Sequence, residues 1–261
     1  MTTAQKLTTI AENEQKVYEA GCKEGNILAK ATSWHYMFAE NARNELLPYV
    51  KYNDTDNVSD MSYAFYQNNN ITELPEINTS NVSDFKCFCY EATKLESIPD
   101  LDFSKGTVFM CAFDTCRRVH NIPDLDLSSA TNLQYMFNLC ENSHYYGKLK
   151  TGNCTNFYGM FRYCTYTVEV KEIDLTNATN AGYIFHGCVN LHRVYFKGSI
   201  NVNLNLSAST YLEYDSIMSA INALADRTDT TALTLTLGTT NLAKITDEEK
   251  AIATEKGWTL A

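Results

Sequence analysis

The stretch Asn132-Leu-Gln-Tyr-Met-Phe-Asn-Leu-Cys140 decides the fold, because altered versions of it return every 24 residues. Its phenylalanine position defines one column of equivalent residues: Phe65, Cys89, Phe113, Phe137, Phe161 and Phe185. A second column lies three residues later: Asn68, Ala92, Cys116, Cys140, Cys164 and Cys188. Self-similarity at a period of this length indicates a chain built from stacked repeats.

Each repeat predicts a short helix followed by a short strand. The i, i+4, i+7 spacing of Met61, Phe65 and Asn68 matches one face of a helix of about two turns. Two residues before this face, at a typical N-cap position, stands a column of hydroxyl residues: Ser59, Ser83, Thr107, Thr131, Thr155 and Thr179. Segment 95–98 suits an inward-facing strand, which Pro99 should end because it lacks a backbone donor.

Segments such as Asn57-Val-Ser-Asp-Met-Ser-Tyr-Ala-Phe65 resemble the BspA-like bacterial leucine-rich repeats, in their surface-protein variety. The resemblance covers roughly residues 31–196. It implies an α/β leucine-rich-repeat solenoid, with a short helix and a short parallel strand in each 24-residue rung and caps at both ends. Such a repeat is specific for a fold and carries little information on function.

We expect three parts in the chain. Residues 1–30 form an N-terminal helical cap or docking segment, residues 31–200 the solenoid, and residues 201–261 the C-terminal capping repeats. The last part predicts helices over 211–227 and 246–256 and a strand over 232–237; the second helix opens with a capping box, Thr246-Asp-Glu-Glu249. A further strand follows at Trp258-Thr-Leu260.

Composition and charge narrow the function classes. A net charge of −10 argues against nucleic-acid binding, which needs clustered Lys and Arg. No apolar stretch approaches the length of about 18 residues that spans a membrane, so we expect no membrane partner. The N-terminus lacks the apolar core of a signal peptide, which predicts a protein made in the cytoplasm.

The nine cysteines predict buried thiols rather than disulfides or a metal site. Cys116 and its equivalents share an inward column that Ala92 or Asn68 fills in other rungs, and free cysteine behaves as a small buried hydrophobe. No C-x-x-C pair has zinc-ligand spacing. We expect no bound metal and no cofactor.

Two columns of ionisable residues leave alternatives open. The acidic column comprises Glu76, Asp100, Asp124 and Glu172, with Asp102, Asp126 and Asp174 beside it. It could bind calcium, or the Asp102 set could accept from turn N–H groups while the Glu76 set stays solvated. The histidine column, His120, His144 and His192 with Glu96, could share a metal or be plain surface. Neither column provides a nucleophile with an oriented base, so we expect no enzyme.

The pattern breaks at Ser143 and Thr167, where other rungs have an apolar residue. This break predicts either a surface cluster of Tyr145, Tyr163 and Tyr166 or local variation in the core. Tyrosines suit protein or glycan contacts because they combine apolar area with a hydroxyl group. The column that we expect to bind a partner is Glu73, Ser97, Asn121, Tyr145, Glu169 and Arg193.

The opening segment Lys6–Gly21 and the end, with Ser216–Leu224, Leu233–Gly238 and Gly257–Leu260, resemble prophage-encoded structural proteins of gut bacteria. This resemblance implies a virion-associated role. We therefore expect a non-enzymatic interaction protein, a phage or prophage tail- or baseplate-associated module that binds a protein or surface glycan through its repeats. The alternative is a bacterial cell-surface protein of adhesin type, which the repeats alone resemble equally well. Residues 1–30 could also join copies of the chain into a homo-oligomer.

Overall fold

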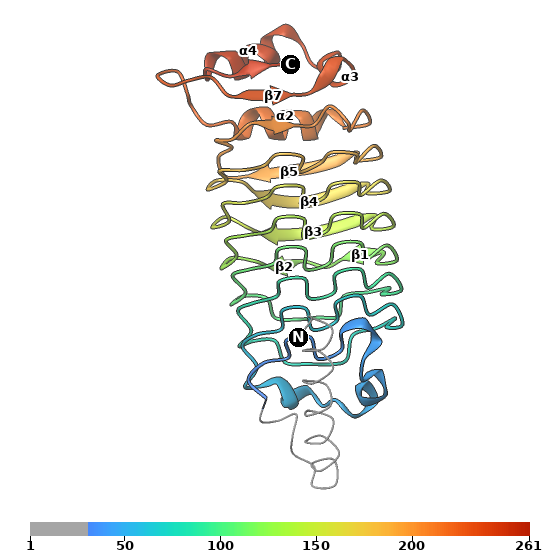
Figure 1. Cartoon of the computed structure of the whole chain (residues 1–261). Coiled ribbons are helices and arrows are strands. Elements are labelled where there is room, and N and C mark those ends of the chain that lie inside the picture. The colour runs from blue at the N-terminus through green and yellow to red at the C-terminus, as the bar shows by residue number, and fades with distance from the viewer. Residues whose placement is uncertain (1–30) are drawn as a thin grey trace, which may run out of the picture.

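Successive segments of the chain lie one above another in a single stack (Figure 1). The computed structural model describes residues 31–261, and the expectations for residues 1–30 lie outside this part. Parallel bridges join equivalent residues of adjacent rungs, such as Asp60 with Asp84 and Val108 with Asn132. The 24-residue period read from the sequence is thus the step from one rung to the next in the region of these bridges.

The strands form two parallel sheets. The first contains β1 (Asn121–Ile122), β2 (Leu125–Asp126), β3 (Tyr145–Lys150), β4 (Glu169–Asp174) and β5 (Arg193–Lys197), and both β1 and β2 pair with β3. The second contains β6 (Leu204–Asn205), β7 (Thr234–Thr236) and β8 (Thr259–Leu260). Pro123 lies between β1 and β2, in agreement with a proline that interrupts regular pairing.

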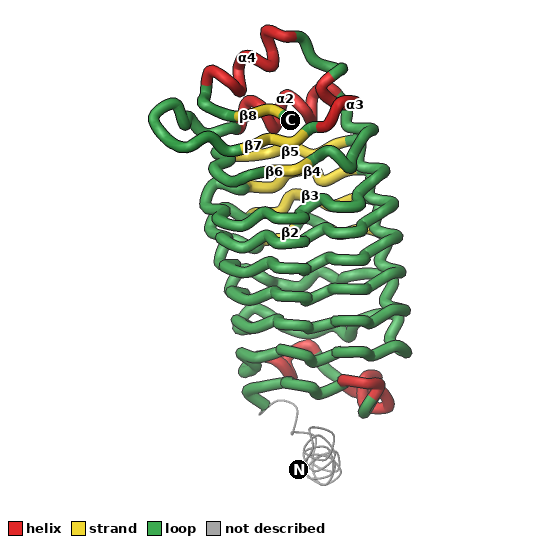
Figure 2. The backbone as a smooth tube through the Cα atoms, turned by 45° about the horizontal axis from the view of Figure 1, so that its top comes forward, coloured by secondary structure: helices red, strands yellow, loops and turns green. Residues whose placement is uncertain are grey.

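The helices lie near the two ends of the described stack. Three short 3-10 helices come first: η2 (Ala39–Asn41), η3 (Asn44–Tyr49) and η4 (Tyr52–Thr55). The α-helices α2 (Tyr214–Ala223), α3 (Gly238–Leu242) and α4 (Asp247–Glu255) belong to the C-terminal part, and Figure 2 shows loops and turns over most of the stack between. Residues 31–261 are therefore mixed α/β, with parallel sheets and few helices. None of the helices of residues 31–261 is long and apolar enough to cross a membrane.

The prediction of one short helix per repeat is wrong, because residues 57–200 form turns where helices were expected. In the segment 61–68, alternate N–H groups donate to carbonyls of the next rung at 2.6–2.9 Å, those of Met61, Tyr63, Phe65 and Gln67. The N–H groups of Ala64, Tyr66 and Asn68 donate to the carbonyl three residues back, and that of Ser62 donates to the Asp60 carboxylate. Tyr63 and Gln67 have φ of 59° and 51°, which an α-helix does not contain. The segment is a chain of turns that repeats every four residues, so its apolar spacing resembles that of a helix.

The Ser/Thr column does not cap helices either. Each hydroxyl donates to the backbone carbonyl of its equivalent one rung earlier, at 3.1–3.2 Å for Ser83, Thr107, Thr131, Thr155 and Thr179. The backbone N–H of the same residue donates to the same carbonyl, at 2.8–3.3 Å. We call this series the hydroxyl ladder. It joins the rungs at the start of each turn segment.

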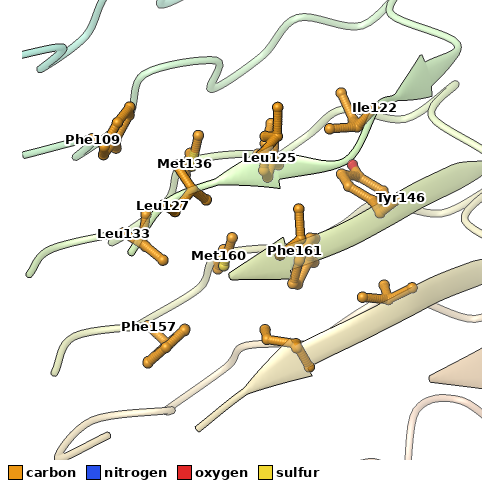
Figure 3. Packing of buried hydrophobic residues seen from close by; sticks show 14 of the residues in the cluster. Phe109, Ile122, Leu125, Leu127, Leu133, Met136, Tyr146, Phe157, Met160 and Phe161 are labelled. Atoms are coloured by element: carbon orange, nitrogen blue, oxygen red, sulfur yellow. The ribbon is translucent and has the colours of Figure 1, made fainter. Parts of the chain in front are cut away.

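Phenylalanine rings stack through the centre of the molecule. Ring centroids are 5.8 Å apart for Phe113 and Phe137, 5.9 Å for Phe137 and Phe161, and 5.3 Å for Phe161 and Phe185. Figure 3 shows a parallel inward column of Phe109, Leu133 and Phe157 on successive rungs. Since a fully buried Phe contributes about 1.5–3 kcal/mol of transfer free energy, these columns supply much of the stability.

Phe88 fills the gap that Cys89 leaves in the phenylalanine column. Its ring lies edge-on to Phe65 and Phe113, with centroid distances of 5.3 and 6.0 Å. Both Phe88 and Cys89 are fully buried. The aromatic core is therefore continuous, although the column read from the sequence is not.

The prediction of buried thiols is confirmed for the inward cysteine column. Cys116, Cys140, Cys164 and Cys188 are fully buried, and their thiols donate to backbone carbonyls of the preceding rung at 3.0–3.1 Å. Burial raises the pKa of all four. Every cysteine in residues 31–261 is a free thiol.

The C-terminal part covers the exposed edge of β5. Helix α2 lies against this strand, and the hydroxyls of Ser216 and Ser219 accept from the N–H groups of Val194 and Phe196 at 3.0 and 2.9 Å. These bonds satisfy strand donors that would otherwise be open to another chain. The capping box of α4 is confirmed, since Thr246 and Glu249 each accept from the other's backbone N–H.

Candidate interaction surface

Most of the predicted binding column lies in register on the first sheet. Asn121 pairs with Tyr145, Tyr145 with Glu169, and Glu169 with Arg193, along β1, β3, β4 and β5. Glu73 and Ser97 are exposed residues of earlier rungs and belong to no strand. We call this side of the stack the strand side, and the side of segment 61–68 and its equivalents the turn side.

Two residues of the predicted binding column, Glu169 and Arg193, form an ion pair, and Arg193 also pairs with Glu213. The Arg193 guanidinium lies 3.3 Å from a carboxylate oxygen of Glu169 and 3.0 Å from one of Glu213. All three side chains are partly exposed, so the pairs add little to stability. They place charged groups of both signs beside Tyr145.

Aromatic and imidazole rings gather next to these ion pairs. The ring of His144 lies 6.4 Å from that of Tyr145 and 6.3 Å from that of Tyr166. The ring of His192 stacks on that of Tyr211 at 5.5 Å. Backbone bonds from His192 to Val168 and from Val168 to His144 place the two histidines two rungs apart, which corresponds to about 10 Å.

We call the set His144, Tyr145, Tyr166, His192 and Tyr211 the aromatic–histidine patch. Its three tyrosines are 48%, 54% and 60% exposed, in chain order. The backbone beneath the first four residues is held by rung-to-rung hydrogen bonds, so the rings stand on a rigid support. Tyr211 lies after the 24-residue grid has ended, and the sequence therefore did not single it out.

The expected tyrosine cluster is wrong for Tyr163, which lies on the turn side. Its ring is 5.2 Å from that of His186, and the Arg162 guanidinium lies over it at 4.4 Å. Tyr145 and Tyr166 both contact His144 instead. The histidine between them is what joins these two tyrosines.

The break in the apolar pattern is a variation of the core. Ser143 and Thr167 are buried, and their hydroxyls donate to the carbonyls of Val119 and Ser143 at 2.7 and 2.8 Å. The neighbouring ring of Tyr146 points inward, as Figure 3 shows, and its hydroxyl lies 3.4 Å from the Cys164 sulfur. Small hydroxyl residues therefore accompany a large ring in the core directly beneath the patch.

The two acidic columns make different contacts, and only the Asp102 set forms turns. Asp102, Asp126 and Asp174 each accept from the N–H two residues later, at 2.9, 3.1 and 2.9 Å, which confirms the Asx-turn interpretation. Asp124 accepts from the Lys148 N–H at 2.8 Å, and Glu172 lies 3.6 Å from the Lys197 ammonium. Residues 31–261 contain no group of three or more His, Cys, Asp or Glu side chains that could hold a metal ion.

A buried carboxylate on the turn side gives a pH-dependent prediction. Asp114 accepts from Asn138 at 2.8 Å and from Thr115 at 2.9 Å, and desolvation by burial raises the pKa of its carboxyl group. Folding therefore favours the protonated form, so this group destabilises the fold as pH rises above about 4. We expect Asp114→Asn, which keeps the acceptor oxygen without the charge, to stabilise the chain at neutral pH and to lose this advantage at acidic pH.

Urea denaturation at neutral pH and near pH 4 measures this difference, with the unchanged chain as reference. Other carboxylates contribute equally to both proteins and cancel in the comparison. A variant that is less stable than the unchanged chain at neutral pH would contradict the prediction.

The comparisons with known proteins show similarity to one family model over two stretches of the chain. A family model described as "Mycoplasma protein of unknown function, DUF285" matches residues 32–146 and again residues 107–202. No curated protein and no solved structure matches the chain. The two matches overlap, as expected when one model aligns to a repetitive chain in two registers.

Proposed function

Since the chain belongs to the DUF285 family of Mycoplasma proteins of unknown function, we propose that it is a non-enzymatic interaction protein that binds a partner through its strand side. We further propose that its rungs are leucine-rich repeats of the BspA-like kind, arranged as a solenoid. The observation that carries the functional proposal is the aromatic–histidine patch, an exposed group of rings on a rigid wall of paired backbone.

The chemistry of the patch suits binding. Tyrosine side chains bring large, stiff, amphipathic area with few rotatable bonds, and they are enriched among residues that dominate binding energy. The imidazoles of His144 and His192 add donors and acceptors between the rings. The charged groups of Glu169, Arg193 and Glu213 border the same area. This combination fits a protein segment or a surface glycan.

A tail- or baseplate-associated role follows from the resemblance of both ends to prophage-encoded structural proteins. In this arrangement, residues 1–30 attach the chain to the virion or to further copies, and the strand side contacts the host surface. The alternative is an adhesin-like protein displayed by the bacterium itself. Copurification with virion proteins would favour the first role, and recovery from the bacterial envelope would favour the second.

The test of the proposed function is a binding measurement with a tyrosine-deficient patch. We expect the triple variant Tyr145→Ala, Tyr166→Ala, Tyr211→Ala to bind intact anaerobic gut bacteria at least about tenfold more weakly than the unchanged chain, which corresponds to about 1.4 kcal/mol. Fluorescently labelled full-length chain, titrated against the cells, gives the dissociation constant.

The matched control is Tyr183→Ala, because Tyr183 is equally exposed, at 53%, and lies on the turn side against Tyr158 and His186. This variant should bind as the unchanged chain does. If the triple variant retains full affinity while it remains folded by circular dichroism, the patch is not the binding surface.

A further inference from the structure

Two cysteines outside the buried thiol column lie on the turn side. Cys87 and Cys111 hold equivalent positions on adjacent rungs: the N–H of Cys87 donates to Met110 at 2.9 Å, and that of Cys111 to Gln134 at 2.9 Å. Directly opposed residues of adjacent parallel segments are separated by about 4.8 Å. This spacing falls inside the range of about 4.4–6.8 Å that a disulfide requires between Cα atoms.

The two side chains leave the backbone in the same direction. Cys87 and Cys111 have nearly identical left-handed φ values, 52° and 57°. Other members of this column show the result: the rings of Tyr36 and Tyr63 stack at 4.7 Å with an interplanar angle of 14°. The sulfur atoms of Cys87 and Cys111 therefore face one another across the rungs.

The surroundings of this pair favour thiolate formation. The contact with the Cys111 thiol lowers the pKa of Cys87. Burial opposes this shift, and the Tyr63 hydroxyl and the Lys86 ammonium add smaller contributions in the lowering direction. The same thiol–thiol contact raises the pKa of Cys111, so the pair releases its first proton more readily than its second. The core cysteines have pKa values raised by burial. Cys111 is also partly exposed, whereas the inward column is fully buried.

We propose that Cys87 and Cys111 form a redox-active dithiol that reacts with a low-molecular-weight disulfide and closes a disulfide bond between adjacent rungs. The thiolate of the pair attacks one sulfur of the reagent RSSR, which forms a mixed disulfide and releases RS⁻. The second cysteine then loses its proton and attacks the protein sulfur of the mixed disulfide, which releases the second RS⁻. Two protein thiols are oxidised, and one RSSR is reduced to two RSH.

The bond adds a covalent link between two rungs that backbone hydrogen bonds, such as that from the Cys87 N–H to Met110, already join. It encloses the 24-residue step between Cys87 and Cys111, which restricts the unfolded chain. The aromatic–histidine patch lies on the strand side and on later rungs, so this modification is separate from the proposed binding surface.

Peptide mapping of the full chain tests the proposal. The protein is incubated with oxidised glutathione, denatured, alkylated with iodoacetamide and digested with trypsin. Cleavage after Lys86, Lys94, Lys105 and Arg117 places Cys87 in peptide 87–94 and Cys111 in peptide 106–117. We expect these peptides to be joined, and fragment ions to place the bond at Cys87 and Cys111 rather than at the buried Cys89 and Cys116.

Two variants sharpen the result. Cys111→Ser should prevent the cross-link and leave a stable glutathione adduct on Cys87, the thiolate of the pair, because no second thiol remains to resolve it. Cys154→Ser, which removes a buried thiol elsewhere, should keep the cross-link. If Cys87 and Cys111 of the unchanged chain are alkylated equally with and without oxidised glutathione, or carry only separate adducts, the proposal is overturned. The mapping of the unchanged chain decides this even if a variant fails to fold.

Discussion

Replacement of Phe137 by alanine is expected to lower the free energy of unfolding by about 3–5 kcal/mol. Phe137 is fully buried, and its ring lies 5.8 Å from Phe113, 5.9 Å from Phe161 and 5.2 Å from Tyr146. The rungs above and below are held at the strand spacing by backbone bonds, so they cannot collapse into the space left by the ring. The lost transfer free energy and the cavity both contribute to the cost.

Urea denaturation followed by circular dichroism measures this effect. Tyr166→Ala is the control, because it also removes an aromatic ring, but from an exposed position, and should change stability by about 0.5 kcal/mol or less. The transition of Phe137→Ala should also broaden, since rungs on either side of the cavity become able to unfold separately. Equal stability of the two variants would mean that the ring column does not form the core.

Replacement of Asn68 by alanine is expected to cost about 2–4 kcal/mol, because it leaves buried polar groups without partners. The Asn68 amide is fully buried, and its Nδ2 donates to the Phe38 carbonyl at 2.8 Å and to Asn44 at 2.7 Å. Its Oδ1 accepts from the N–H of Ile71 at 3.2 Å. Alanine fits this column, since Ala92 occupies the next rung, so the cost comes from the lost hydrogen bonds.

The matched variant is Asn44→Ala, which removes one partner of Asn68 and keeps its bonds to Phe38 and Ile71. It should cost about 1 kcal/mol. Hydrogen exchange of the Ile71 amide gives a local measurement: exchange should accelerate strongly in Asn68→Ala and little in Asn44→Ala. Unchanged protection of Ile71 in Asn68→Ala would contradict the role assigned to this side chain.

The sequence predicts the stacking and the core well, since both depend on which residues recur at the 24-residue period. It does not distinguish turns from helices, because Met61 and Phe65 face inward in either conformation. What decides for turns is the set of hydrogen bonds from alternate N–H groups to the next rung, a long-range contribution that local propensity does not contain. The one local sign was Gly159 and Gly187, both with positive φ, in the columns of Tyr63 and Gln67.

The candidate surface was predictable only where it follows the repeat. Asn121, Tyr145, Glu169 and Arg193 lie in register because the period sets their alignment. Tyr211 enters the patch through its stacking on His192, after an irregular connection that no period describes. Cys87 and Cys111 stand 24 residues apart in the sequence, which is one repeat, but the direction of their side chains depends on a left-handed backbone that a cysteine does not predict.

The hydroxyl ladder lets the length of the molecule change by a fixed step for each repeat that is added or removed. In each rung of the ladder, one hydroxyl and one backbone N–H donate to the same carbonyl of the rung before it. Duplication or deletion of one 24-residue segment therefore leaves the remaining hydrogen bonds of the ladder intact. Each such event moves the C-terminal part away from or toward residue 31 by one strand spacing, about 4.8 Å. The length of the stack can therefore change in steps of one rung, while the shape of its strand side and its turn side stays the same.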